Sequence, residues 1–191
     1  MKQRLPLFLF CILAVFTVSA QTIDTVRFKG HPIGGTMEDF VQMMMKEGYE
    51  YVEQNNDIVV MSGTYCGQDS CLIFVSPIHG GDWVNSVCVT FPKEDSWMLL
   101  KRYYLLLKDV LVEQYGECYR SVEEFMSGYE DGDGNEMEAV RKDRVFYYSD
   151  WGKGAITLSV SKNQRVILKY KNKRSDKGHP YGGKGVSIDD L

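Results

Sequence analysis

The chain has 191 residues, of which 44% are hydrophobic and 25% charged, and its formal net charge at pH 7 is −4. This length and this hydrophobic content fit one globular domain or two small packed halves. Nucleic acids and anionic membrane surfaces attract proteins with an excess of Lys and Arg, so an acidic chain matches neither. We therefore expect no nucleic-acid partner.

Residues 1–20 have the parts of a secretory signal peptide. Lys2 and Arg4 precede an apolar run, and Val18-Ser19-Ala20 ends it with the small residues that signal peptidase reads. This run is shorter than a membrane-spanning helix, and no later stretch reaches that length. We expect an exported protein, periplasmic or secreted, with no transmembrane segment in the mature chain. The mature net charge is −6, from 20 basic against 26 acidic residues.

The mature chain keeps four cysteines, Cys66, Cys71, Cys88 and Cys118. Exported proteins meet an oxidising compartment, so two disulfides are the expected state. Four cysteines allow three pairings. Cys66 and Cys71 flank a turn-like insert at 67–70 and would face each other across a hairpin, which leaves Cys88 for Cys118. Buried free thiols are the alternative interpretation.

The segments outside the long helix show a helical period first and then a strand period. A short strand at 25–28 and a turn at 31–35 precede a helix whose capping box is Thr36 with Asp39. Stretches rich in Val, Ile, Tyr and Phe, bounded by turn residues, then predict two antiparallel meanders. The predicted strands are 49–52, 58–64, 72–76 and 84–91 in the first meander and 145–149, 155–161 and 166–171 in the second.

The longest patterned segment is the predicted helix at 96–116, which ends at Gly116. A helix of about 20 residues is about 30 Å long, enough to cross a four- or five-stranded sheet. Apolar side chains at three- and four-residue spacing predict the face that packs on this sheet. That face is Leu99, Tyr103, Leu106, Leu107, Val110 and Leu111, and the predicted solvent face is Lys101, Arg102, Lys108, Asp109 and Glu113.

The element order predicts an α+β fold, in the order β-α-β4-α-β3, with the long helix packed on the sheet. It suggests two related helix-plus-antiparallel-sheet halves, residues 21–95 and 96–171, although identity between them is too weak for a sequence repeat. Residues 172–191 lack apolar periodicity and predict a flexible tail. The expected organisation is a signal peptide, one α+β domain at 21–171 and this tail.

One local motif has metal-ligand spacing. Asp131, Asp133 and Asn135 follow the one-three-five pattern by which a loop surrounds Ca²⁺. Glu136 and Lys142 then stand where an EF-hand loop needs glycine and a bidentate glutamate. Two interpretations remain: a looser calcium turn, or a solvated acidic turn built from ordinary turn formers, which is the simpler one. No other cofactor is predicted.

The sequence contains no catalytic pattern that we recognise. It lacks Gly-x-Ser-x-Gly and a complete phosphate-binding glycine loop, and none of its three histidines has a zinc-ligand partner at the usual spacing. We assign no catalytic residue. Tyr147, Tyr148 and Trp151 either fill the core or form a platform for a sugar or peptide, and the core interpretation is the favoured one.

Several short stretches carry a family resemblance: 28–36, 63–65, Tyr115-Gly116, Glu124-Phe125 and 131–136. Through them the chain resembles small exported proteins of uncharacterised function from Bacteroides-type gut bacteria, over about residues 25–171. Cys66 and the glycine-rich tail depart from this pattern. The resemblance implies no activity, substrate or catalytic residue. In element order the chain is also similar to tandem helix-plus-sheet modules of secreted inhibitors and outer-membrane assembly factors, which bears on fold alone.

Two hypotheses for function follow. The first is a non-enzymatic periplasmic or secreted binding module for an unidentified protein or glycan. The second is a glycan-acting hydrolase of the envelope or gut lumen, suggested by acidic residues beside aromatic ones. Two carboxylates about 5–9 Å apart under an aromatic ring would favour the hydrolase. A flat or concave apolar sheet would favour binding.

Overall fold

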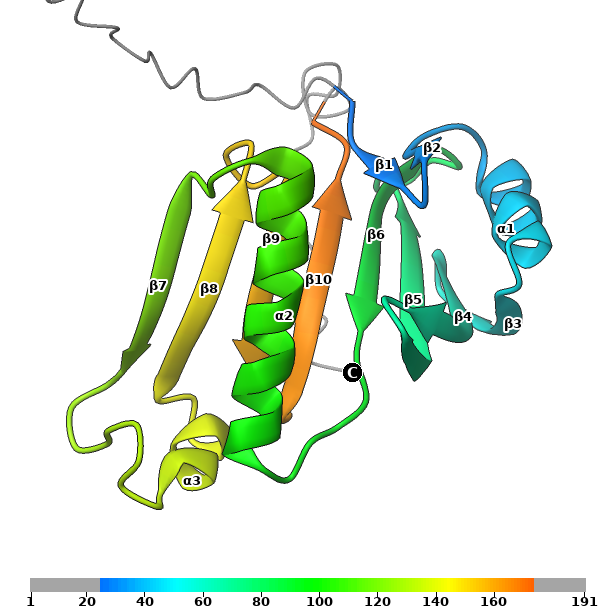
Figure 1. Cartoon of the computed structure of the whole chain (residues 1–191). Coiled ribbons are helices and arrows are strands. Elements are labelled where there is room, and N and C mark those ends of the chain that lie inside the picture. Colours follow the sequence, from blue (N-terminus) through cyan, green and yellow to red (C-terminus); the bar gives the residue numbers. More distant parts are fainter. Residues whose placement is uncertain (1–24, 174–191) are drawn as a thin grey trace, which may run out of the picture.

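The computed structural model describes residues 25–173 and has an α+β fold with a single large antiparallel sheet (Figure 1). The predicted signal peptide and residues 174–191 of the predicted tail lie outside the described residues. Helix α2 (Trp97–Tyr115) crosses one face of this sheet over β8, β9 and β10, as predicted for the long helix. None of the helices within 25–173 has the length and hydropathy that crossing a membrane requires.

Eight strands form the large sheet in the spatial order β3-β4-β5-β6-β10-β9-β8-β7. Their bounds are β3 (Glu50–Asn55), β4 (Ile58–Tyr65), β5 (Gln68–Pro77), β6 (Val84–Thr90), β7 (Arg120–Phe125), β8 (Val145–Trp151), β9 (Ile156–Ser161) and β10 (Arg165–Lys171). The middle pair, β6 with β10, joins segments far apart in the chain, for example Cys88 opposite Lys169. The remaining elements are the hairpin β1 (Arg27–Phe28) and β2 (His31–Pro32), and helices α1 (Met37–Lys46) and α3 (Glu136–Arg141).

Both predicted meanders are present, but the predicted element order is incomplete. It lacks β2, α3 and β7, each of which is short or polar. The sequence of β7, RSVEEF, has too few apolar residues to suggest a strand. It forms one because it pairs with β8 along its whole length, at the edge of the sheet where charged side chains remain in water.

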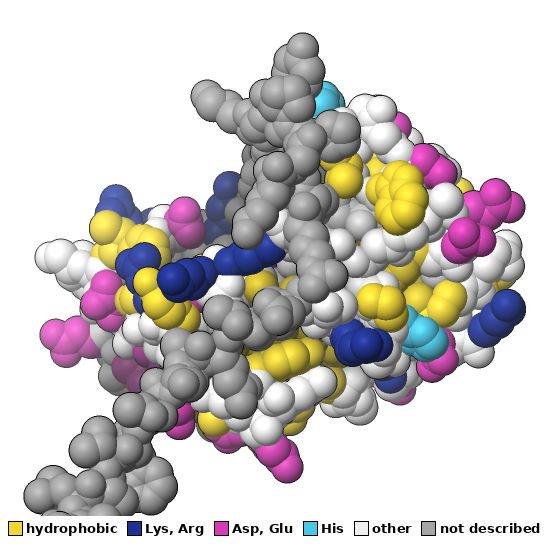
Figure 2. Space-filling view, turned by 90° about the horizontal axis from the view of Figure 1, so that it is seen from above, with side chains coloured by type: hydrophobic (Ala, Val, Ile, Leu, Met, Phe, Trp, Pro, Cys, Tyr) yellow, Lys and Arg dark blue, Asp and Glu magenta, His cyan; other side chains and the backbone are white. Residues whose placement is uncertain are grey.

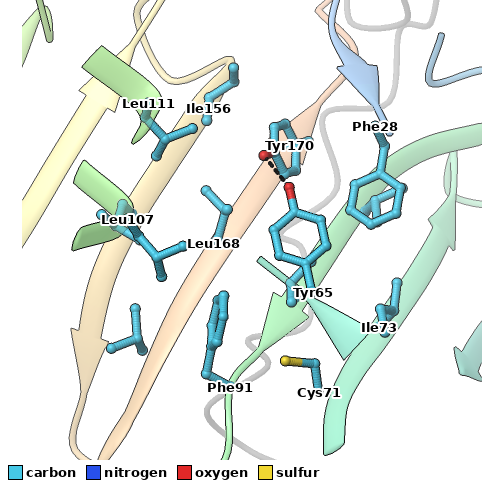
Figure 3. Close-up of a cluster of buried hydrophobic side chains, with 14 of the residues drawn as sticks. Phe28, Tyr65, Cys71, Ile73, Phe91, Leu107, Leu111, Ile156, Leu168 and Tyr170 are labelled. Atoms are coloured by element: carbon cyan, nitrogen blue, oxygen red, sulfur yellow. Dashed lines mark hydrogen bonds between the residues drawn. The ribbon is translucent and has the colours of Figure 1, made fainter. Parts of the chain in front are cut away.

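The buried face of α2 differs from the predicted one. Trp97, Leu100, Tyr104, Leu107 and Leu111 face the core. Figure 3 shows Leu107 and Leu111 beside Leu168 of β10 and Ile156 of β9. Of the residues predicted to be buried, Leu99, Leu106 and Val110 are instead 36%, 50% and 46% exposed.

Burial of two large rings explains this rotation of α2. Apolar residues surround most of the helix, so their spacing alone fits more than one orientation. In the orientation found, Trp97 and Tyr104 are buried and both meet the ring of Tyr147 edge-on. The same orientation directs Lys101 to Asp131 and Lys108 to Glu123 of β7, and these two ion pairs add a smaller stabilisation.

The cysteines do not form the predicted pairs. The β4–β5 turn is Cys66-Gly67, with φ values of 48° and 76° that are typical of a two-residue type I′ turn, rather than an insert at 67–70. Cys66, Cys71 and Cys118 are free thiols, and burial raises the pKa of Cys71 to about 11. Cys118 precedes β7, which lies four strand spacings, about 19 Å, from β6 and Cys88. A disulfide needs Cα atoms within about 7 Å, so this fold does not permit the Cys88–Cys118 bond.

An aromatic cluster joins the N-terminal hairpin to the middle of the sheet (Figure 3). The fully buried ring of Phe28 stacks on Tyr65 at 5.3 Å between ring centroids and meets the ring of Tyr170 edge-on at 5.7 Å. The hydroxyls of Tyr65 and Tyr170 share a hydrogen bond of 2.7 Å. Because Tyr65 lies in β4 and Tyr170 lies in β10, this cluster connects early and late parts of the chain.

Candidate functional site

The acidic loop is fastened to the first turns of α2 through Asp131. The indole Nε1 of Trp97 donates a hydrogen bond of 2.7 Å to Asp131 Oδ1, and Lys101 Nζ donates to Oδ2. The hydrogen bond from Lys101 and then that from Trp97 lower the pKa of Asp131 below its ordinary value of 3.8. Asp131 is therefore a charged partner of α2.

The other two predicted calcium ligands, Asp133 and Asn135, form hydrogen bonds within the loop itself. Asp133 accepts hydrogen bonds from the backbone amides of Glu130, at 3.0 Å, and Asn135, at 2.7 Å. The side-chain amide of Asn135 donates to the carbonyl of Asp133 at 3.4 Å. No group of three or more His, Cys, Asp or Glu side chains that could hold a metal occurs within the described chain. The structure thus gives all three residues roles within the protein.

A groove of about 550 Å³ runs along the outside of α2 beside this loop. Its floor and walls combine apolar side chains with both signs of charge. Its lining includes Trp97, Met98, Arg102, Leu105, Leu106 and Asp109. Met98 is 73% exposed and Leu106 50%, which is unusual for large apolar residues on a helix already packed on one side.

We call the solvent-facing side of α2 its outer face, and it consists of Met98, Leu99, Arg102, Leu106, Asp109 and Val110, all exposed. Neither Arg102 nor Asp109 has an ion-pair partner among the described residues. Sequence reasoning missed this surface because it assigned Leu99, Leu106 and Val110 to the core. The signal that could have found it is the number of apolar residues in the helix, which exceeds what one buried stripe requires.

A second polar cluster joins α2 to β7 and β8. Lys108 Nζ donates to Ser121 Oγ at 2.9 Å and to Glu123, and Ser121 Oγ lies 3.0 Å from Ser149 Oγ, which bonds to the Tyr104 hydroxyl at 2.7 Å. A serine beside a lysine suggests a nucleophile with its base. Here Lys108 Nζ donates to both the serine hydroxyl and the Glu123 carboxylate, which is the geometry of an ion pair and not that of a base accepting the serine proton. The cluster holds the helix on the sheet.

The aromatic residues after the acidic loop lie mainly in the core. Tyr147 is 5% and Trp151 1% exposed, and Tyr147 meets the ring of Trp97 edge-on at 5.0 Å. The core interpretation of these two rings is therefore confirmed. Tyr148, which alternates with them along β8, is only partly buried.

No protein-family model, curated protein or solved structure matches the chain. The resemblance to exported proteins of Bacteroides-type bacteria therefore stays a prediction. Function has to be argued from the surfaces of this molecule.

We expect Asp131→Asn to lower the free energy of unfolding by about 0.5–1 kcal/mol at pH 7, because the Lys101 and Asp131 side chains are 31% and 46% exposed and water screens the pair. Asparagine keeps an oxygen for Trp97 but loses the charge opposite Lys101. The folded-state pKa of Asp131 is depressed, so the stabilisation exists above the unfolded pKa and disappears as pH falls through the folded pKa. Urea unfolding of the wild type and D131N from pH 7 down to pH 2 measures this pH-dependent difference in unfolding free energy.

Asp109→Asn, which removes an exposed carboxylate of α2 that lacks an ion-pair partner, is the control for this experiment. A difference in unfolding free energy between wild type and D131N that persists unchanged at the lowest pH would contradict the assignment.

Thermal melts of the wild type and D131N with millimolar calcium test the calcium hypothesis. Binding through Asp131, Asp133 and Asn135 would raise the melting temperature of the wild type more than that of D131N.

Proposed function

We propose that this protein is an exported, non-enzymatic binding module that holds a protein partner against the outer face of α2. The observation that carries the proposal is the exposure of Met98, Leu99, Leu106 and Val110 along one helix whose other side is already buried in the core. An apolar surface of this kind beside a groove is typical of an interaction site.

The other large exposed apolar side chains belong to several different elements and loops, with Met45 on α1, Tyr51 and Val52 on β3, and Phe146 on β8. Figure 2, which looks down from the top of Figure 1, shows hydrophobic side chains in separate patches among charged ones of both signs. Trp83 belongs to the loop after β5 and Tyr119 precedes β7, so neither extends the outer face of α2. This supports α2 as the place where apolar contact is concentrated.

The charges on the outer face define the chemistry of the partner. Arg102 and Asp109 are seven residues apart, which is about 10 Å along the helix axis, and apolar side chains flank both. A matching segment presents an apolar stripe, with a carboxylate opposite Arg102 and a Lys or Arg opposite Asp109. An amphipathic helix laid along the groove satisfies both conditions.

The arrangement of carboxylates gives the hydrolase hypothesis less support. The acid of a glycosidase needs a raised pKa so that it carries a proton at neutral pH. Within residues 25–173, the carboxylates whose pKa is displaced are Asp131 and Glu138, and lysine partners lower both. The carboxylate beside the Trp97 ring is thus poorly suited to donate a proton.

We also infer that the fold consists of two related halves, residues 21–95 and 96–171. The strand order supports this, because it is symmetric about the β6–β10 pair. On each side of that pair, a helix precedes four strands in the chain, once β7 is added to the predicted three: α1, of 10 residues, in the first half and α2, of 19 residues, in the second. Only the second half keeps an apolar outer face on its helix.

Affinity capture tests the proposed function. The full chain with a C-terminal tag is expressed in the producing cells, and envelope and secreted proteins are recovered after cross-linking and identified by mass spectrometry. We expect Met98→Glu with Leu106→Glu to reduce recovery of a saturable partner by about tenfold or more, because each change places a charge in the apolar contact.

The matched control is Met45→Glu with Val52→Glu, which makes the same two changes at exposed apolar positions outside α2. We expect this control to recover the partner at the wild-type level. Equal recovery from all three proteins would contradict the role of α2. Recovery of only the untagged chain would mean that α2 contacts a second copy, and the proposal of a different partner would be wrong.

A further inference from the structure

A second hollow, of about 660 Å³, lies where the β9–β10 turn meets the chain that leaves β6. Its lining is Lys93, Arg141, Lys162, Asn163, Gln164 and Arg165. These residues are four cations and two amides, without a carboxylate, an aromatic ring or an aliphatic side chain. Such a collection is unexpected in a chain with a net charge of −4.

Backbone contacts hold two sides of this hollow together. The Glu94 amide donates to the carbonyl of Gln164 at 2.9 Å, which fixes the segment carrying Lys93 against the β9–β10 turn. Arg165 donates from Nη1 to the carbonyl of Phe91 at 2.9 Å, and this bond orients its guanidinium. The turn itself is tight, since Gln164 is buried and has a φ of 62°. The backbone that carries Lys93, Lys162 and Arg165 is therefore held in place by these contacts.

Most of this positive charge is not neutralised. Lys93 lies 3.3 Å from Asp95, in a pair whose side chains are 51% and 84% exposed and which contributes little attraction in water. Arg141, Lys162 and Arg165 form no ion pair with any other described residue. Like charges held close together repel one another unless an anion lies between them.

We propose that this hollow is a binding site for a small polyanion that carries two or more phosphate or carboxylate groups. The guanidinium groups of Arg141 and Arg165 match the planar, two-oxygen geometry of these anions, and Lys93 and Lys162 add point charges. The volume lies within the range of small-molecule sites and exceeds what a single phosphate needs. Without an aromatic or aliphatic wall, the hollow offers no stacking surface to a sugar ring and no contact to an apolar ligand.

Calorimetric titration of the full chain at low ionic strength tests this site, with tripolyphosphate, citrate and inorganic phosphate as the probes. We expect saturable one-to-one binding of tripolyphosphate, citrate or both, tighter than that of inorganic phosphate, and weakened by added salt. Binding of tripolyphosphate alone assigns the site to phosphate groups, and binding of citrate alone assigns it to carboxylates.

Paired charge reversals provide the matched comparison. Arg141→Glu with Lys162→Glu should weaken binding by about tenfold or more, because two attractive contacts become repulsive. Lys46→Glu with Arg120→Glu changes the net charge equally at exposed positions outside both the hollow and α2, and it should leave the affinity within about twofold. Circular dichroism and thermal melts verify that both variants are folded.

The proposal is wrong if neither tripolyphosphate nor citrate titrates with wild-type protein, or if the two double variants weaken binding equally. If R141E/K162E unfolds, the milder pair Arg141→Gln with Lys162→Gln replaces it and should also weaken binding. This result is independent of the α2 partner, because none of the residues changed to disrupt the hollow lies on α2.

Discussion

Phe28→Ala is expected to lower the free energy of unfolding by about 3–5 kcal/mol. The Phe28 side chain is completely buried and contacts the rings of Tyr49, Tyr65 and Tyr170. Removing it leaves a cavity between β1 and the middle of the sheet. Tyr65 of β4 and Tyr170 of β10, which come from early and late parts of the chain, both lose their contact with the Phe28 ring. Equilibrium urea unfolding measures the loss.

Two further variants separate the causes of that loss. Val52→Ala, which truncates a side chain that is 50% exposed, should change stability by less than about 0.5 kcal/mol. Tyr170→Phe removes one partner of the 2.7 Å hydrogen bond to Tyr65 and should cost about 1–3 kcal/mol, because the Tyr65 hydroxyl remains buried without it. A loss below 1 kcal/mol for F28A would mean that β1 contributes little to the core.

Gly63→Ala is expected to destabilise the protein by about 1–3 kcal/mol, through overpacking alone. A Cβ at this position would lie 2.5 Å from Cδ1 of Tyr49, whose ring covers the glycine. Gly63 lies in β4 where the register with β5 shifts between Gly63 and Tyr65, but its φ is not positive, so alanine is not forced into the left-handed region there. The ring of Tyr49 is 4% exposed and has little room to move.

A double-mutant cycle with Tyr49→Ala isolates this contact. In the Y49A background the ring is absent, and G63A should then cost less than about 0.5 kcal/mol, so the coupling energy should be of the size of the single-mutant effect. Ser62→Ala on the same strand is the control for general changes in β4. An undiminished cost of G63A in the Y49A background would show that the ring does not restrict position 63.

The long helix illustrates what sequence reasoning can and cannot provide. Its extent was predicted to within about one residue, because a marked end at Gly116 and a long apolar period are local properties. Its orientation was not, because the residues that α2 contacts, among them Tyr147, Asp131 and Glu123, are distant from it in the sequence. Periodicity identifies a helix, but tertiary contacts select the buried side.

The same limit applies to the candidate sites. The acidic loop was singled out from its sequence, but the pairing of Asp131 with the Lys101 ammonium, 30 residues earlier, could not be predicted from that loop alone. The basic hollow had no sequence signal at all, since Lys93, Arg141 and Lys162 become neighbours only after β10 inserts next to β6. The disulfide pairing could not be predicted from the number of cysteines, because the expected compartment does not determine which thiols the fold places close together.

The position of β10 has a consequence for how this chain folds. It is the last strand of residues 25–173, yet it lies in the middle of the sheet, paired with β6 about 80 residues earlier. Until it arrives, β6 and β9 each expose an unpaired edge, so neither part of the sheet is complete. Such distant pairing slows folding. The sheet of a nascent chain therefore stays open until β10 has been made, which is compatible with the export that we propose, because an exported chain crosses the membrane before it folds.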